Sequence, residues 1–324
     1  MTPVTLAEGR DVAALRRAPG APRRTRLTPL AFIAPVLLGI TIFLIYPLVA
    51  AVYFSFTRFT LINPPEWVGL ANWRYLFDDP LVGIAARNTL WLTAVLVPAR
   101  ICGALLTAML VNKMRRSRSV YRTLFYLPAM APPVTATIAF VLLLKPETGP
   151  LAAALGRIGL EPPRWFNDPA WAKPALVLLG LWAIGDLMII FVAALLDVPK
   201  DLYEAAALDG AGAVQRFRFV TLPSISPVLV FAAITGIIGC AQYFTQAAVA
   251  ASVASNQVTG GGGVSGTYTY PQNSMLTYPM WLYTEGFRYN LFGYANVLAL
   301  LLFVVTAGLT ILLLRRFREF VGGR

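Results

Sequence analysis

A polar segment of this sequence contains two characteristic runs, EAAALDG at residues 204–210 and VTLP at residues 220–223. The charged side chains of the surrounding stretch, 197–223, are Asp197, Lys200, Asp201, Glu204, Asp209, Arg216 and Arg218. Each such side chain costs roughly 2.5–3.5 kcal/mol at the centre of a bilayer. We therefore expect this stretch to lie in water, between two apolar stretches that cross a membrane.

Composition indicates an integral membrane protein. Of the 324 residues, 57% are hydrophobic and 13% are charged, whereas a soluble domain carries about 25% charged residues. The sequence contains no histidine, the commonest general base and metal ligand, and no P-loop motif for ATP. We expect this chain to bind no metal or cofactor. Cys102 and Cys240 lie in apolar runs, which predicts two small buried side chains.

Six stretches are long and apolar enough to cross a bilayer as helices, which needs about 20 residues each. We expect these spans at 30–54, 88–111, 124–144, 174–196, 224–251 and 291–314. Lysine and arginine concentrate before residue 27, at 113–122, in 197–223 and after residue 314. The positive-inside rule places these parts, and hence both termini, in the cytoplasm. Topology and anionic lipid explain the net charge of +12 without nucleic acid.

This topology predicts three regions along the chain. A basic cytoplasmic tail covers 1–29, a six-helix transmembrane domain covers 30–316, and a cytoplasmic tail covers 317–324. Within the membrane domain, 197–223 is a cytoplasmic loop between spans four and five, and 252–290 is an outer loop. The outer loop contains a glycine-rich run at 259–263. That run is either a flexible connector or a surface for an extracytoplasmic partner.

The polar segment has the features of a helix, a turn and a second helix. Asp201 can cap a helix whose third residue is Glu204, and the alanines that follow favour a helix. Gly210 can adopt the left-handed conformation that ends a helix, and a second helix is expected at about 213–220. Apolar side chains available to a docked partner are Leu202, Leu208, Val214, Phe217 and Phe219. The alternative is a helix pair that lies on lipid.

The spacing of this segment resembles the coupling motif of permease subunits of binding-protein-dependent ATP-binding-cassette (ABC) importers. The residues that match are Glu204, Ala205, Ala206, Gly210, Val220, Leu222 and Pro223, and Asp209 before the glycine is also usual there. Val220 replaces the more usual isoleucine. The resemblance extends over most of 30–316.

Among these permeases, the sequence is most similar to the carbohydrate branch. The stretches that carry this likeness are 67–70, Asn72, Tyr75, Asn88, Thr89, 122–128, 149–159, the start of the run at Thr259, and 293–295. The sequence departs from the family at Gly263, which Val264 follows in place of a proline. This departure concerns the role of the outer loop.

The resemblance implies a fold, a function and a set of partners. The fold is that of a type I importer permease, an all-α membrane protein with six transmembrane helices. The chain would be a non-catalytic subunit in a bacterial plasma membrane that translocates a sugar or related polyol. Its partners would be a second, paralogous permease, two ABC ATPase subunits that use ATP, an extracytoplasmic solute-binding protein and membrane lipid. Residues implied in ATPase coupling are Glu204, Ala205, Ala206, Asp209, Gly210, Leu222 and Pro223.

Polar residues inside the spans are candidates for the substrate pathway. Asp186 in the fourth span and Arg100 in the second must face the bundle interior, water or a partner, because lipid exposure is costly. Gln242, Tyr243 and Gln246 have the spacing of one helical stripe, which can hydrogen-bond sugar hydroxyls. The alternative role of all five is to hold the helices together.

Two other functions compete with the importer permease. A secondary transporter driven by an ion gradient would need no ATPase and would leave the motif match as an accident. A membrane-embedded enzyme is disfavoured, because the chain has no histidine and no recognisable pairing of nucleophile and base.

Overall fold

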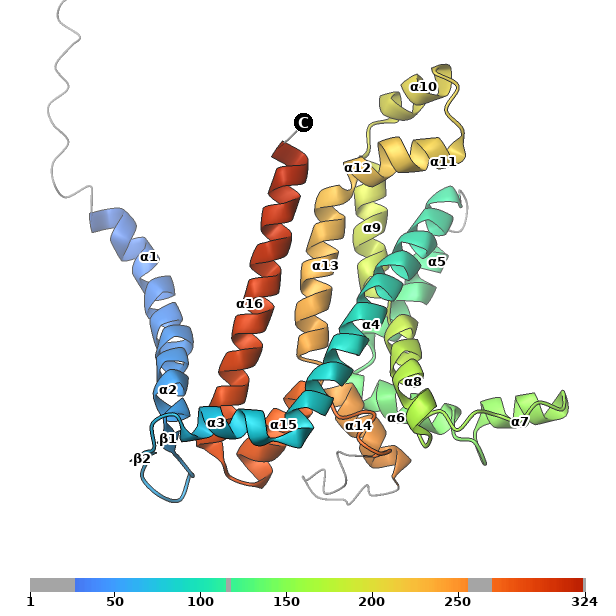
Figure 1. Ribbon diagram of the computed structural model, residues 1–324. Helices are drawn as coiled ribbons and strands as arrows, with labels where there is room; N and C mark the ends of the chain where they lie inside the picture. Colours follow the sequence, from blue (N-terminus) through green and yellow to red (C-terminus); the bar gives the residue numbers. More distant parts are fainter. Residues whose placement is uncertain (1–26, 115–117, 256–269, 323–324) are drawn as a thin grey trace, which may run out of the picture. The chain divides into compact units, whose positions relative to one another are not determined.

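The structure is a computed structural model that describes residues 27–114, 118–255 and 270–322, and it is mostly helical (Figure 1). The N-terminal residues 1–26 and the glycine-rich run at 259–263 lie outside the described residues. The chain divides into two compact units, 1–51 and 52–324. All the sites described below belong to the second unit.

The first unit contains α1 (Leu27–Ile40), η2 (Thr41–Ile45) and the start of α2 (Tyr46–Ser55). These elements form one span-length helix, Phe32–Ser55, none of whose most apolar window is buried. Its apolar side chains are exposed in the isolated chain, and Phe32 and Phe43 are each 81% exposed. Such a surface suits lipid or another membrane subunit.

The second unit is built mainly from helices of very different lengths. Its long helices are α4 (Pro80–Lys113) and α16 (Phe292–Gly322). Its other elements are β1 (Thr57–Arg58), β2 (Glu66–Trp67), α3 (Ala71–Asp78), α5 (Arg118–Tyr126), η3 (Leu127–Met130), α6 (Pro133–Leu143), α7 (Pro150–Arg157), α8 (Pro169–Trp182), α9 (Gly185–Asp197), α10 (Lys200–Leu208), α11 (Ala213–Arg216), η4 (Phe217–Thr221), α12 (Leu222–Ser224), α13 (Ser226–Ala241), α14 (Thr245–Ala254), α15 (Tyr278–Tyr283) and η5 (Thr284–Arg288). The strands form one antiparallel pair, Thr57 with Trp67 and Arg58 with Glu66.

Among the described residues, three helices could cross a membrane unbroken, and six spans result if each of three bent helix pairs counts as one. The first two pairs, 118–143 and 169–197, correspond to the expected spans at 124–144 and 174–196. The third pair, 213–241, joins the end of the polar segment to the first part of the span expected at 224–251. The six expected spans therefore include three that are bent helix pairs. The pairs bend by 97°, 49° and 68° respectively.

Proline accounts for two of the bends. Pro132 and Pro133 follow the short helix η3, and a residue before proline avoids helical geometry, so α6 starts afresh at Pro133. Pro227, near the start of α13, has no amide hydrogen to donate to a carbonyl one turn earlier, so the helix cannot run on unbroken from α12. The bend between α8 and α9 contains no proline. Instead, the backbones of Gly185 and Phe125 approach closely at the break, where a Cβ at Gly185 would overlap the Phe125 carbonyl.

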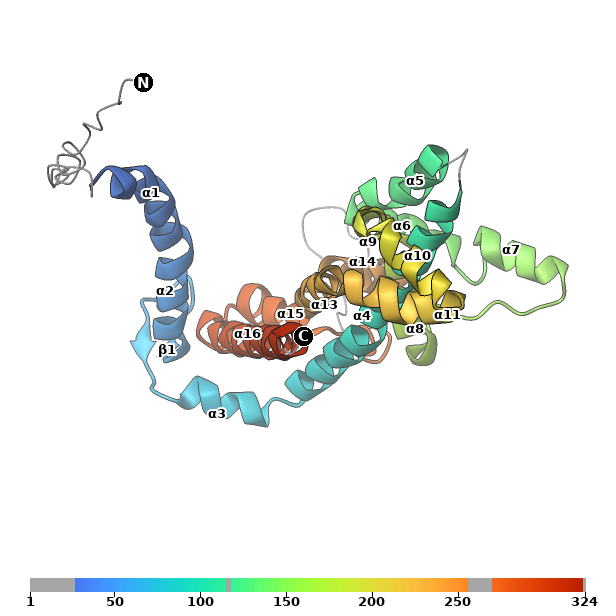
Figure 2. The ribbon, with the colours of Figure 1, turned by 90° about the horizontal axis from the view of Figure 1, so that it is seen from above.

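The core forms around α4. This helix packs against α8, α9 and α13, and α13 lies between α16 and the α4–α9 pair (Figure 2). Ala104 and Ala108 on α4 are fully buried in a cluster with Met188 and Phe191 of α9. Small side chains of this kind let membrane helices approach closely. A second cluster surrounds α15, where Met280 is fully buried.

The two cysteines differ in their environment. Cys240 is 5% exposed and confirms the expectation of a buried side chain. Cys102 is exposed, so the same expectation is wrong for it. An apolar run predicts that a residue lies within a span. Whether that residue faces the core or the outside of the bundle depends on how the helix packs.

Candidate functional site

The polar segment folds as a helical excursion beyond the ends of α9 and α13 (Figure 1). Its first helix, α10, begins at Lys200 after Pro199, whose ψ of 133° is not helical. No side chain caps this end. The prediction that Asp201 is the N-cap is therefore wrong, because the N-cap position is taken by Pro199, two residues earlier. Asp201 lies in the first turn, where its negative charge interacts favourably with the positive end of the helix dipole.

The end of α10 agrees with the prediction for Gly210. Its φ is +78°, in the left-handed region, and the Gly210 amide donates to the Ala207 carbonyl oxygen at 3.1 Å. The Ala211 amide donates to the Ala206 carbonyl oxygen at 2.9 Å. This pair of bonds is the Schellman arrangement, which satisfies the last carbonyls of a helix and fixes the exit direction of the chain.

The second helix is longer than the predicted 213–220, since α11, η4 and α12 run on to Ser224. The Gly212 amide donates to Gln215 Oε1 at 2.8 Å, which fixes its start. The Tyr203 hydroxyl lies 2.9 Å from Thr221 Oγ1 and joins the two helices. Leu222 and Pro223 are half-buried, in the turn that precedes the bend into α13. The two helices are thus joined to each other, and the second leads through Leu222 and Pro223 into α13.

The outer surface of this pair carries unpartnered groups. Glu204 is exposed and makes no hydrogen bond or ion pair with any described residue. Beside it Ala205 is exposed and Ala206 is half-buried. The exposed apolar side chains are Leu202 (47%), Leu208 (90%), Val214 (79%) and Phe219 (70%). Phe217, expected among them, packs instead against the buried cluster that includes Val198 and Ile225.

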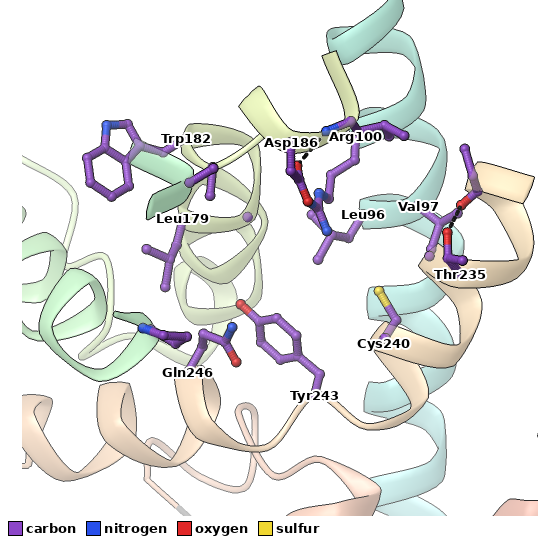
Figure 3. A pocket seen from close by; sticks show the side chains of 18 of the residues that line it. Leu96, Val97, Arg100, Leu179, Trp182, Asp186, Thr235, Cys240, Tyr243 and Gln246 are labelled. Carbon is purple, nitrogen blue, oxygen red and sulfur yellow. Dashed lines mark hydrogen bonds and ion pairs between the residues drawn. The ribbon is translucent and has the colours of Figure 1, made fainter. Parts of the chain in front are cut away.

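A second candidate site is a cavity of about 590 Å³ inside the second unit. It is walled by α4, α6, α8, α9, α13 and α14 and by η3 with the residue that follows it (Figure 3). All five residues predicted for the substrate pathway line it: Arg100, Asp186, Gln242, Tyr243 and Gln246. Residues that lie up to 146 positions apart in sequence therefore share one space.

Arg100 and Asp186 form an ion pair across this cavity. One terminal guanidinium nitrogen lies 3.1 Å from Asp186 Oδ1 and 3.2 Å from Oδ2. The Leu187 amide also donates to Oδ1, at 2.7 Å. The pair remains partly open, with side-chain exposures of 31% for Arg100 and 56% for Asp186. Mutual neutralisation explains how two charges persist within spans of this composition.

The three polar residues near the end of α13 reach the cavity, but they do not form one helical stripe. The helix ends at Ala241, and α14 begins only at Thr245, so the expected continuous turn is wrong. The Thr277 hydroxyl donates to the Tyr243 carbonyl oxygen at 2.8 Å and holds this break in place. Tyr243 is 8% exposed, and its hydroxyl, which points into the cavity (Figure 3), has no described partner.

A buried acidic centre at the end of the bundle opposite α10 has no counterpart among the predicted site residues. Asp79 is 7% exposed and accepts hydrogen bonds from Trp281 Nε1 at 2.7 Å and the Tyr294 hydroxyl at 2.8 Å. It also caps α4 through the Leu81 amide at 2.9 Å. The sequence signal was Asp79 followed by Pro80, the pattern of an N-cap before a proline in the first turn.

Glu285 of η5 lies near this centre and is 3% exposed. Burial, and secondarily the negative charge of Asp79, raise the pKa of Glu285 to about 7. Asn88 ties the same region to α4, since its side-chain amide donates to the carbonyls of Asn273 and Leu276 at 2.7 and 3.0 Å. These two hydrogen bonds give Asn88 a structural role.

The comparisons with known proteins agree on one family. The family model of the binding-protein-dependent transport system inner membrane component matches residues 100–319. The probable ABC transporter permease protein YesP of Bacillus subtilis is 31% identical over 90% of this chain and 91% of its own length. The lactose transport system permease protein LacF of Rhizobium radiobacter is 33% identical over 89% of this chain and 93% of its own.

A solved structure shares the fold. A chain from the crystal structure of a bacterial ABC transporter involved in the import of the acidic polysaccharide alginate superposes with a TM-score of 0.77. The match covers 91% of this chain and 96% of that one, at 22% identity. The chain thus has the membrane fold of a type I importer permease. The chain belongs to the family of binding-protein-dependent transport system inner membrane components, the permeases of ABC importers.

Proposed function

We propose that this chain is the membrane-spanning permease subunit of an ATP-driven importer that carries a sugar or related polyol. Family membership supports the import function. The names of the relatives support the cargo class, because they include transport systems for lactose, arabinooligosaccharides and sulfoquinovosyl glycerol. An extracytoplasmic binding protein delivers the cargo.

The chain itself performs no chemistry in this proposal. Two separate ATPase subunits bind and hydrolyse ATP, and a second permease, a paralogue of this chain, completes the pathway. The predicted limits of the membrane domain, 30–316, and the cytoplasmic location of both termini are part of the proposal. So is the bacterial plasma membrane as its location, with lipid as a partner and no nucleic acid.

The observation that carries the coupling role is the unpartnered surface of α10. An exposed carboxylate next to small side chains, on a helix fixed at its C-terminal end, suits a groove in a partner with a basic side chain. A rigid helix transmits a displacement of the ATPase to α9 and α13, to which it is tied. The residues proposed to act in coupling are Glu204, Ala205, Ala206, Asp209, Gly210, Leu222 and Pro223.

Glu204→Lys tests this coupling role. Because Glu204 touches no described partner in its own chain, the change should alter the free energy of unfolding by no more than about 0.5 kcal/mol. It should lower ATP-driven uptake by about tenfold or more, since a buried charge pair with the ATPase is lost. Glu161→Lys is the matched control, because Glu161 is also exposed and unpartnered among the described residues but lies far from α10 in sequence.

The assay uses right-side-out membrane vesicles that contain the transporter, with labelled sugars and the extracytoplasmic fraction outside. Uptake should require ATP inside the vesicles and should persist when ionophores collapse the ion gradients. Uptake that needs a gradient and no ATP would replace the proposal with a secondary transporter. Normal uptake by Glu204→Lys would leave the importer function intact and remove α10 from the coupling role.

A further inference from the structure

The cavity carries a specific combination of charge and polarity. Among the described residues that line it, Arg100 and Asp186 are the charged ones, and each neutralises the other. The cavity wall of this chain therefore has no net charge, although it holds a guanidinium and a carboxylate. A cargo molecule that enters meets a dipole, with both charges already paired.

The carboxylate is held firmly against its arginine. Asp186 follows the bend between α8 and α9, where the backbone of Gly185 is pressed against the Phe125 carbonyl. The Leu187 amide fixes one carboxylate oxygen, and the guanidinium contacts both. Arg100 keeps a buried Nε–H without a partner among the described residues. This arginine could serve an anion, but Asp186 already occupies the position of that anion.

The rest of the wall suits uncharged hydroxyl groups. Gln242 and Gln246 each offer an amide donor and an amide acceptor, and the buried Tyr243 hydroxyl has no described partner. Trp182 lines the opposite part of the cavity (Figure 3) and can stack on the apolar face of a sugar ring. Neutral amides and hydroxyls hydrogen-bond sugar hydroxyls without requiring a counter-charge.

We propose that this cavity accepts uncharged glycosides and that Asp186 determines this preference, by neutralising Arg100 against anionic sugars. The proposal rests on the importer function above and specifies its substrate class. The comparisons leave the charge of the cargo open, since the relatives and structural neighbours serve both lactose and acidic alginate. An anionic sugar would have to displace Asp186 and leave a carboxylate unpaired in the span, which is costly.

The first arm of the test measures which cargo is carried. ATP-driven uptake is measured for neutral disaccharides (lactose, maltose and cellobiose) and for their counterparts in which one C6 hydroxymethyl group is a carboxylate. The expected result is uptake of a neutral sugar at about tenfold or more the rate of its carboxylate counterpart. Equal or faster uptake of the carboxylate sugars would overturn the proposal and leave the importer function standing. No ATP-driven uptake of any sugar would contradict the importer function itself.

The second arm removes the binding protein, which has a selectivity of its own. Equilibrium binding of the labelled sugars is measured on the solubilised transporter. Asp186→Asn should raise the affinity for the carboxylate sugar by about tenfold or more, because Arg100 is released. Adding Arg100→Gln should cancel this gain, because the wall is then neutral again. A gain that survives in the double variant, or no gain in an assembled Asp186→Asn transporter, would refute the role of Asp186.

Arg100→Gln alone provides a reciprocal test that does not depend on the stability of Asp186→Asn. It leaves Asp186 unpaired in the cavity, so an amino sugar with a protonated amine should bind about tenfold more tightly than to the wild type. The carboxylate sugar should bind no better. Equal gains for both sugars would indicate a looser cavity and would overturn the electrostatic explanation. Glu161→Gln, outside the cavity, should change none of these affinities.

Discussion

Replacement of Gly210 by alanine should loosen the end of α10 by an amount that the geometry defines. At φ +78° an L-residue pays the left-handed penalty of about 1–2 kcal/mol. No heavy atom lies within 4 Å of the position that a Cβ would take, so backbone strain is the whole effect. Since 1.4 kcal/mol is a factor of ten, the end of the helix should open roughly 5 to 30 times more often.

Gly212→Ala is the matched control for this variant. Gly212 has a φ of −71°, which any residue adopts, and the nearest atom to its added Cβ would be Gln215 Oε1 at 3.8 Å. Amide hydrogen exchange followed by mass spectrometry on peptides that cover 200–212 measures the opening. The amides of Gly210 and Ala211, which close the Schellman turn, should exchange faster in Gly210→Ala alone. Equal exchange in both variants would refute the explanation.

Three further predictions concern the end of the bundle opposite α10. Asp79→Ala leaves two buried donors unpaired and should lower the free energy of unfolding by about 2–6 kcal/mol, measured as a lower thermal midpoint. Gly293→Ala should destabilise the protein because its Cβ would overlap the Thr57 carbonyl, whereas Gly308→Ala, with open space, should not; equal midpoints would contradict this. Because the pKa of Glu285 is raised to about 7, folding favours its protonated form. Stability should therefore be highest below the usual carboxyl pKa and fall as the pH rises to about 7; Glu285→Gln should abolish this dependence, and a midpoint that rises with pH would refute it.

The long spans and the end of α10 could be predicted because their signals are local. An apolar run of sufficient length predicts a span wherever it occurs, and Gly210 ends a helix through its own backbone. The prolines next to two of the bends were also visible in the sequence, but length and composition alone do not indicate where a span bends.

The close approach at the bend next to Gly185 could not be predicted, because the backbone that Gly185 contacts, that of Phe125, lies about 60 residues earlier in the sequence. The cavity was only partly foreseen for the same reason. Arg100 and Asp186 were recognised singly from the cost of charge in a span, but that each is the partner of the other depends on how α4 packs against α9. Asp79 was missed because its donors, Trp281 and Tyr294, are more than 200 residues away in sequence.

The most direct test of the central claim is to purify this chain from its native membrane in mild detergent and identify the bound proteins by mass spectrometry. The account predicts an ABC ATPase and a second permease with the wild-type chain and with Glu161→Lys. It predicts that the ATPase is lost with Glu204→Lys while the second permease remains. Recovery of the chain alone, or of the ATPase in equal amount with Glu204→Lys, would contradict the claim that α10 is the surface through which ATP drives import.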